Sequence, residues 1–269
     1  MVKKLFKHEF LFYARVMAIV YAILLTIATA NRVIQVFEND SIAYTIISVF
    51  SGITYGVSVI AALGFSFVLG ITRFYKNLFT GEGYLTFTLP ATPHQHIVVK
   101  VITAVCVELI SLVMILISVC IISAGEMLKE IIIALRYLVG ELYQVVGNHL
   151  VTVGLEFALL ILIACFTSIM LYYTFISIGQ LFKKNRILAA VGAYFVYYIL
   201  TQIVSTVISI VFSILAANGA LDQVGLWVID HVSAAVHIGM WSAIVLSAVF
   251  ALVEYLVIKW VITKKLNLE

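Results

Sequence analysis

Three carboxylates in this sequence lie inside long apolar segments, where an ionised side chain is costly: Glu108, Glu156 and Glu254. A charge placed in hydrocarbon usually marks a water-filled cavity or a pairing partner. We interpret Glu108 and Glu156 as candidates for lining a pathway taken by a cationic or polar substrate. The alternative is that each carboxylate accepts hydrogen bonds from neighbouring helices, and that Glu254 pairs with Lys259.

Motifs for phosphate or zinc chemistry are absent from the sequence, which has neither a GxxxxGK[ST] loop nor an HExxH pair. His94 and His96 share one loop with no cysteine or third carboxylate that would complete a tetrahedral zinc site. The three cysteines lie in apolar runs and are predicted to be free and structural. We therefore predict no catalytic site, no metal and no cofactor held by this chain, and no enzymatic activity. A second polar group is either a zinc or proton sensor or a set of wet interfacial side chains: His149, Asp230, His231 and His237.

The amino-acid composition is strongly apolar. Of the 269 residues, 64% are hydrophobic and only 11% are charged, and the mean hydropathy is +1.18. A soluble domain could not cover this much apolar surface, so most of the chain must lie in lipid. We predict an all-α membrane protein, because helices satisfy their own backbone polar groups and a barrel would need short alternating strands. The net charge of +3 argues neither for nor against nucleic acid, which is not among the partners we expect.

Six windows are long enough to cross a bilayer core, which needs about 20 apolar residues. Placing the N-terminus in the cytoplasm leaves only three of the 16 lysine and arginine residues outside, namely Arg32, Lys129 and Arg136. This excess of positive charge on the inner side sets the orientation, and an even number of spans then returns the C-terminus to the cytoplasm. The expected spans are 14–36, 42–71, 97–123, 150–178, 187–216 and 237–262.

Three further segments have amphipathic helical patterns. Residues 1–13 carry Lys3, Lys4 and Lys7 among aromatic residues, which predicts a helix in the inner headgroup region. The alternative is a simple cytoplasmic extension of the first span. Residues 124–149 and 217–236 are expected to form helical segments on the outer surface, the second with Trp227 at the interface.

The inner loop 72–96 is unusually apolar for a connection between spans. Its pattern predicts a short helix over 72–79, which Gly81 and Gly83 then end. A new helix is predicted to open at Thr92, with Pro93 at the first helical position and Gln95 completing a capping box.

Here the sequence resembles a known family. The runs FYKNLFTGEGYLTFTLPATPHQHIVVK and GQLFKKNRILAAVGAYF look like inner segments of type-2 permeases of ATP-binding-cassette (ABC) exporters, a class common in Gram-positive bacteria. The six-span layout is similar as well, whereas the outer segment 124–149 is longer than the family leads us to expect. The resemblance implies a coupling helix that docks on a separate ATPase subunit. Its expected residues are Arg73, Phe74, Tyr75, Lys76, Leu78, Phe79, Glu82 and Tyr84.

The resemblance implies one permease domain over residues 1–269 in a bacterial plasma membrane. ATP and magnesium would bind the partner ATPase, and a second permease chain, identical or not, would complete the pathway. In the second span, Ser48, Gly52 and Gly56 form a small-residue stripe expected to pack against a helix of this chain or of the second permease. The alternatives are a six-span subunit of an importer, an ATPase-independent carrier, or an intramembrane enzyme. A carrier would show an internal repeat, and we find none in the sequence.

Overall fold

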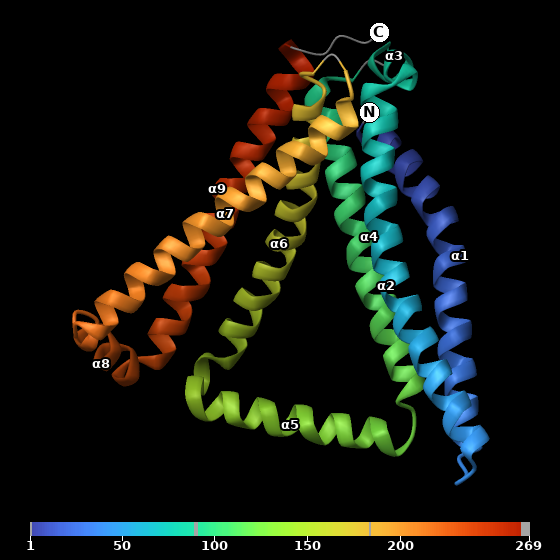
Figure 1. Cartoon of the computed structure of the whole chain (residues 1–269), viewed down its shortest axis with the longest axis vertical. Helices are drawn as coiled ribbons and strands as arrows, with labels where there is room; N and C mark the ends of the chain where they lie inside the picture. The colour runs from blue at the N-terminus through green and yellow to red at the C-terminus, as the bar shows by residue number, and fades with distance from the viewer. Residues whose placement is uncertain (1, 89–90, 183, 265–269) are drawn as a thin grey trace. The chain divides into compact units, whose positions relative to one another are not determined.

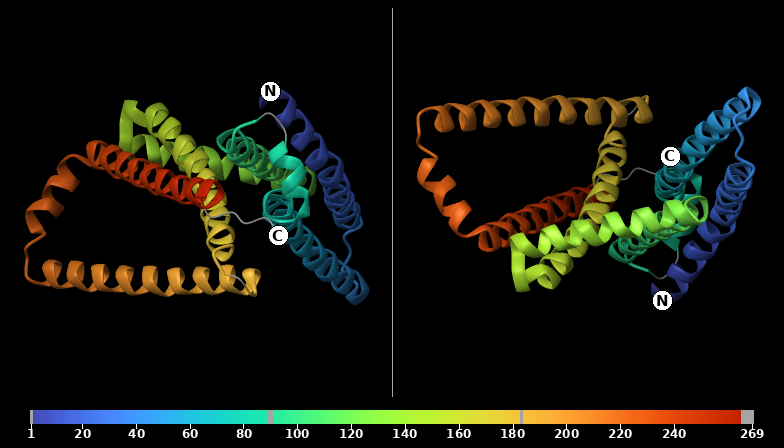
Figure 2. Two further views of the ribbon diagram at one scale, coloured as in Figure 1. Left: turned by 90° about the horizontal axis from the view of Figure 1, so that it is seen from above. Right: turned by 90° about the horizontal axis from the view of Figure 1, so that it is seen from below.

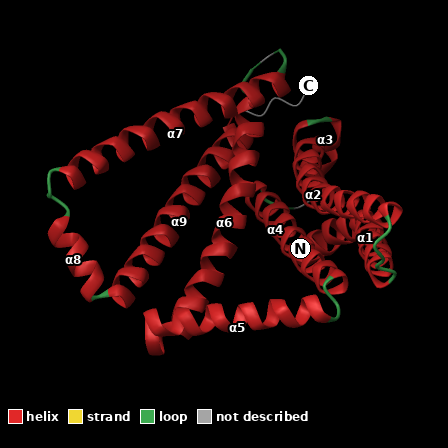
Figure 3. Cartoon of the chain, turned by 60° about the horizontal axis from the view of Figure 1, so that its bottom comes forward, coloured by secondary structure: helices red, strands yellow, loops and turns green. Residues whose placement is uncertain are grey.

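The computed structural model describes residues 2–88, 91–182 and 184–264. Within these residues the chain is helical and contains no strand (Figures 1 and 3). Six segments are long and apolar enough to cross a membrane, which confirms the predicted all-α class and the predicted number of candidate spans. The side of the membrane on which the termini lie stays a prediction. The long helices are α1 (Val2–Val36), α2 (Ile42–Phe79), α4 (Pro93–Ile122), α6 (Leu150–Gly179), α7 (Arg186–Ala217) and α9 (Val232–Lys264).

Shorter helices connect the long ones. The expected outer segments are helical, the first as α5 (Glu126–Val146) with the short turn η1 (Gly147–His149), the second around α8 (Asp222–Asp230). On the predicted inner side lies α3 (Gly81–Thr88). Pro90 and Lys183, which belong to the two runs that resemble the permeases, and Lys265, one of the inner basic residues, lie outside the described residues.

The chain divides into two compact units that meet within α5, at residues 137 and 138. Each unit contains three long helices, with a short helix between the second and the third. The prediction of a single permease domain stays a prediction.

In the first unit, α1 packs against both α2 and α4, and α2 also contacts α4. The contact face of α1 is a stripe at helical spacing, so that one side of the helix meets protein and the other is left for lipid. Polar side chains join the helices as well. The Tyr21 and Ser111 hydroxyls lie 2.8 Å apart, and Asn31 donates to the Ser51 carbonyl at 2.6 Å. Such bonds hold membrane helices together where lipid provides no hydrophobic drive. The buried stripe of α1 is Tyr13, Met17, Leu24, Ala28 and Asn31.

In the second unit, α6 packs against α9 along its length and against the start of α7. The α6–α7 contact is aromatic, with Phe175 5.6 Å from Tyr194 and 5.3 Å from Tyr197 between ring centroids. Gly179 permits the close approach, because a Cβ there would lie 2.6 Å from the carbonyl oxygen of Arg186. Beyond this contact α7 runs apart from α9, and α8 joins their far ends (Figure 2).

Residues 2–13 do not form a helix separate from the first span. From Val2 onwards they are part of α1, without a break. This agrees with the alternative interpretation, in which the segment extends the first span. No glycine or proline interrupts this segment, and Tyr13 is buried on the same face as the rest of the stripe. Packing therefore holds the segment in line with the span.

The short helix expected over 72–79 is the end of α2, not an element of its own. The break falls at Thr80, whose backbone is extended (φ −116°, ψ −173°). Gly81 and Gly83 consequently begin α3 and do not end the preceding helix. The start of α4 is as predicted, because the Thr92 hydroxyl accepts from the Gln95 amide and the Gln95 side chain accepts from the Thr92 amide.

Candidate functional site

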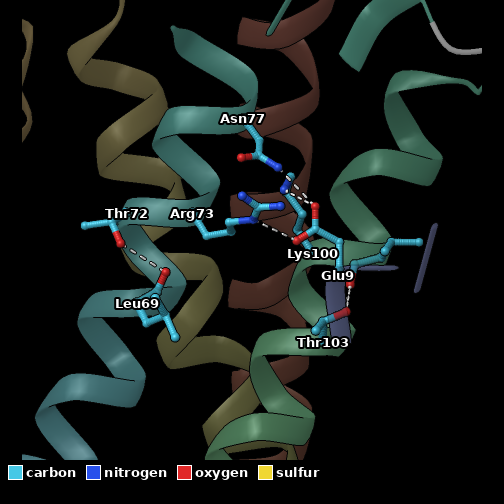
Figure 4. A network of polar contacts seen from close by, with 8 residues as sticks. Glu9, Leu69, Thr72, Arg73, Asn77, Lys100 and Thr103 are labelled. Atoms are coloured by element: carbon cyan, nitrogen blue, oxygen red, sulfur yellow. Dashed lines mark hydrogen bonds and ion pairs between the residues drawn. The ribbon is translucent and has the colours of Figure 1, made fainter. Parts of the chain in front are cut away.

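A largely buried carboxylate, Glu9 of α1, is the centre of a polar cluster in the first unit. Lys100 of α4 lies 2.9 Å from Oε1, Asn77 of α2 donates to the same oxygen at 3.1 Å, and Arg73 Nε lies 3.2 Å from Oε2. Figure 4 shows the three side chains converging on the carboxylate. One side chain thereby joins the three long helices of the unit. We call Glu9, Arg73, Asn77 and Lys100 the junction.

Local helix geometry brings the junction together. Glu9 lies one turn before the buried Tyr13, so it continues the face with which α1 contacts its neighbours. Arg73 and Asn77 are four residues apart on α2 and therefore share a face. Lys100 is two turns from the capping box at Thr92, which fixes where α4 begins.

The charges of the junction differ in burial. The side chain of Lys100 is 4% exposed, that of Glu9 is 13% exposed and that of Arg73 is 26% exposed. A buried ammonium is tolerated only where a counter-ion offsets its lost hydration, and Glu9 supplies that charge. The Arg73 guanidinium also stacks on Phe12, with Cζ 4.0 Å from the ring centroid, which fixes its plane.

A pocket of about 410 Å³ opens beside the junction. Its walls come from the start of α1, the end of α2, α3 and the start of α4, with Lys4, Arg73, Thr86 and Lys100 among the lining residues. The volume is in the range of small-molecule sites. No group of three metal-ligating side chains occurs among the described residues, His94 and His96 included.

The expected coupling residues separate into two sets. Phe74, Leu78 and Phe79 are 0%, 0% and 4% exposed, so they are core residues of the first unit and do not present a surface to another protein. The reason is that α2 continues to Phe79, which carries their side chains onto its packed face; Phe74 and Phe79 pack edge to face at 5.7 Å. Tyr75 is half-buried against Phe79. The residues that remain exposed are Lys76, Glu82 and Tyr84, and Arg73 belongs to the junction.

The two candidate pathway carboxylates lie in different units. Glu108 is half-buried in α4, beside the Ser66 hydroxyl of α2. Glu156 of α6 accepts a hydrogen bond from Trp241 Nε1 at 2.9 Å and bonds His237 Nδ1 at 2.8 Å. Both partners of Glu156 belong to the neighbouring helix α9. This agrees with the alternative interpretation, in which the carboxylate is bonded by a neighbouring helix and does not line a pathway.

Two histidines of the polar group predicted on the outer side lie close together. The rings of His149 and His237 lie 5.4 Å apart, edge to face, while His231 stacks on Trp227 at 5.2 Å. Glu254 is buried, and within the described parts of the chain it has no ion pair with Lys259 and its Oε2 has no hydrogen-bond partner.

The two glycines of the small-residue stripe of α2 have open space beside them among the described residues. A Cβ added at Gly52 or Gly56 would meet nothing within 4 Å. The helix instead uses the adjacent face, where Ser51 bonds Asn31 of α1 and Tyr55 bonds Ser118 of α4. The packing of the stripe Ser48, Gly52 and Gly56, against a helix of this chain or of a second permease, stays a prediction.

A polar stripe on α7 is a feature that the sequence analysis missed. Its members recur at intervals of three and four residues and line a groove of about 500 Å³ on one face. Every residue of this part of α7 is exposed. Gln202 lies at the middle of the helix, which is apolar enough to span a membrane. The stripe consists of Gln202, Ser205, Thr206, Ser209 and Ser213.

Glu9 was not predicted as a site residue, although the sequence contains an indication of its role. It is the one acidic residue among the first thirteen, and Arg73 and Lys100 lie at the inner ends of the expected second and third spans. A lone carboxylate entering the membrane region beside two such cations suggests a pair. Only the packing of α1 between α2 and α4 identifies the partners.

The six apolar helices make this chain a multi-pass membrane protein. Comparisons with protein-family models, with curated proteins and with solved structures found no match. Its function is therefore argued from the arrangement of its own residues.

Proposed function

We propose that this chain is the membrane-spanning permease subunit of an ABC exporter in a bacterial plasma membrane. It works as a permease pair and is driven by a separate ATPase subunit that binds ATP and magnesium. The observation that carries the proposal is α3, an eight-residue helix held between the end of α2 and the start of α4. The resemblance of this segment to the coupling region of type-2 permeases gives the helix its proposed role.

The exposed residues around α3 are suited to docking on another protein. Glu82 is exposed in the first turn, Tyr84 is 56% exposed, and Lys76 is exposed one turn before the end of α2. An aromatic anchor flanked by charges of both signs is a common composition for a protein interface. We assign the ATPase contact to these three residues, in place of the buried Phe74, Leu78 and Phe79.

The junction gives α3 a rigid connection to the spans. The helix packs against α2, and Thr86 lines the same pocket as Arg73 and Lys100. Because Glu9 joins α1, α2 and α4 at this end of the unit, a displacement of α3 moves the three helices together. ATP-driven closure of the ATPases would use this connection to shift the permease pair between inward-closed and outward-open arrangements.

The polar stripe on α7 supports a pathway formed by two chains. An amide with no hydrogen-bond partner in hydrocarbon costs about 4–8 kcal/mol, and Gln202 lies at the middle of a candidate span with its face exposed. The stripe must therefore meet water or protein. A polar pathway between two permease chains provides both, and substrate would leave the cell along it.

A carrier that needs no ATPase is the second candidate, and one observation favours it. The two units share the order long, long, short, long. Two halves built as structural repeats are common in secondary carriers. An importer subunit has no comparable support.

Co-purification separates these candidates. The tagged full-length chain is extracted from its own cells in mild detergent, and the bound polypeptides are identified. We expect a chain that carries a GxxxxGK[ST] loop to co-purify with the wild type, to be lost with Tyr84→Glu, and to remain with Tyr137→Glu. Tyr137 is the matched control because it is 70% exposed and lies on α5.

The proposal fails if no such ATPase co-purifies with the wild type, or if both variants retain it equally. Phe79→Glu is unsuitable for this test, since a charge at a 4% exposed core position would disturb the fold itself.

A further inference from the structure

The pocket beside the junction has the charge, depth and free donors of an anion site. We propose that it binds an anionic phosphate group, carried either by a lipid headgroup or by a soluble phosphate compound. The proposal does not depend on the ABC assignment, because it concerns only what the first unit binds.

Positive charge prevails in the walls of the pocket. Lys4, Arg73 and Lys100 are cationic, and Glu9 is the one carboxylate among the described lining residues. Glu9 is already fully engaged, since it faces Lys100 and Asn77 at one oxygen and Arg73 at the other. Glu82 lies close enough to act on Lys100 but does not line the pocket. An incoming cation would find no carboxylate to pair with, whereas an anion would meet excess positive charge.

Hydrogen-bond donors also remain available. The Arg73 guanidinium bonds Glu9 through Nε, and no acceptor for its terminal nitrogens occurs in the described parts of the chain. Lys100 has Glu9 as its acceptor there and keeps N–H groups in reserve. Stacking on Phe12 holds the guanidinium plane in place, and a fixed fork of donors matches the oxygens of a phosphate.

The depth of the pocket suits a headgroup. Glu9 precedes the expected first span by five residues, Arg73 follows the expected second span by two, and Lys100 is four residues into the expected third. These residues therefore lie near the boundary between apolar core and headgroups. Basic pockets between helices at this level are typical of sites for anionic headgroups.

The test is isothermal titration calorimetry on the full chain in a nonionic detergent. The three probes are dioctanoyl phosphatidylglycerol, dioctanoyl phosphatidylcholine and inorganic phosphate. Each is titrated into the wild type, Lys4→Glu and Lys7→Glu. Lys4 lines the pocket, whereas Lys7 is also exposed on the same helix and does not line it. Both variants change the net charge equally, so they differ only in position.

We expect phosphatidylglycerol or inorganic phosphate to bind saturably and phosphatidylcholine to bind far more weakly. Lys4→Glu should weaken the binding about tenfold and Lys7→Glu less than about twofold, as expected for a charge in the site and one outside it. Binding of phosphatidylglycerol without phosphate identifies a lipid site, and strong binding of phosphate identifies a soluble ligand. The proposal is overturned if neither anionic probe binds, if phosphatidylcholine binds equally well, or if the two variants weaken binding alike.

Discussion

Removing the charge of Glu9 is the sharpest test of the junction. Glu9→Gln keeps the size of the side chain but leaves Lys100 and Arg73 without their counter-ion, and it turns an N–H donor towards groups that are donors themselves. Lys100 accounts for most of the expected loss of stability, because its side chain is only 4% exposed. Breaking a buried pair in this way costs about 3–5 kcal/mol. Arg73 adds less than Lys100, since its side chain is 26% exposed and water reaches part of its charge.

Thermal unfolding of the full chain in detergent, followed by tryptophan fluorescence, measures this loss. The expected fall in apparent Tm is roughly 10 °C for a chain of this size. Glu38→Gln is the matched control, because Glu38 is exposed in the turn after α1 and should change stability by less than about 0.5 kcal/mol.

A double variant separates loss of the pair from loss of packing. In Glu9→Gln/Lys100→Met no buried ammonium remains, so the double variant should recover at least about 1 kcal/mol relative to Glu9→Gln alone. The reasoning is refuted if Glu9→Gln is no less stable than Glu38→Gln, or if the double variant recovers nothing.

Three other substitutions test the second unit and the helix ends. Glu156→Gln should lower stability by about 1–3 kcal/mol, since the largely buried carboxylate bonds both His237 and Trp241 of α9. Glu141→Gln on the exposed face of α5 should change the melting temperature little. Gly179→Ala should cost about 1–3 kcal/mol by overpacking, because its Cβ would meet a carbonyl oxygen at 2.6 Å and a methyl group at 2.7 Å. Gly52→Ala, with nothing within 4 Å, should leave unfolding unchanged or raise its temperature, and equal effects at the two glycines would contradict the packing described. Thr92→Ala removes the cap of α4 and should cost about 1 kcal/mol, to be measured by circular dichroism on heating; an unchanged melting curve would count against the capping box.

Features governed by neighbouring residues were predictable from the sequence. The six apolar segments and the capping box at Thr92 are confirmed, because hydropathy and cap chemistry act over one helix or one turn. The end of α2 was less predictable. Gly81 and Gly83 suggested a stop, but the break falls at Thr80, where an extended backbone lets the glycines start a new helix.

The candidate site depended on contacts that the sequence does not reveal. Phe74 and Phe79 have the composition of a docking surface, yet both are core residues. Glu9 looked like one charge in a basic segment, yet it joins three helices. An aromatic side chain has the same apolar surface whether its neighbour is its own chain, a lipid or a partner, so composition alone cannot distinguish these environments.

The sequence by itself determined that this chain is helical, that it lies in lipid and how many times it can cross a bilayer. These properties follow from the energy of each segment in hydrocarbon, which needs no knowledge of the other segments. Tertiary structure alone decided which faces of the helices meet, and with them the partners of Glu9, the burial of Phe74 and the exposure of the polar stripe on α7. Such contacts join residues far apart in the chain, and only the packed arrangement of helices brings them within bonding distance.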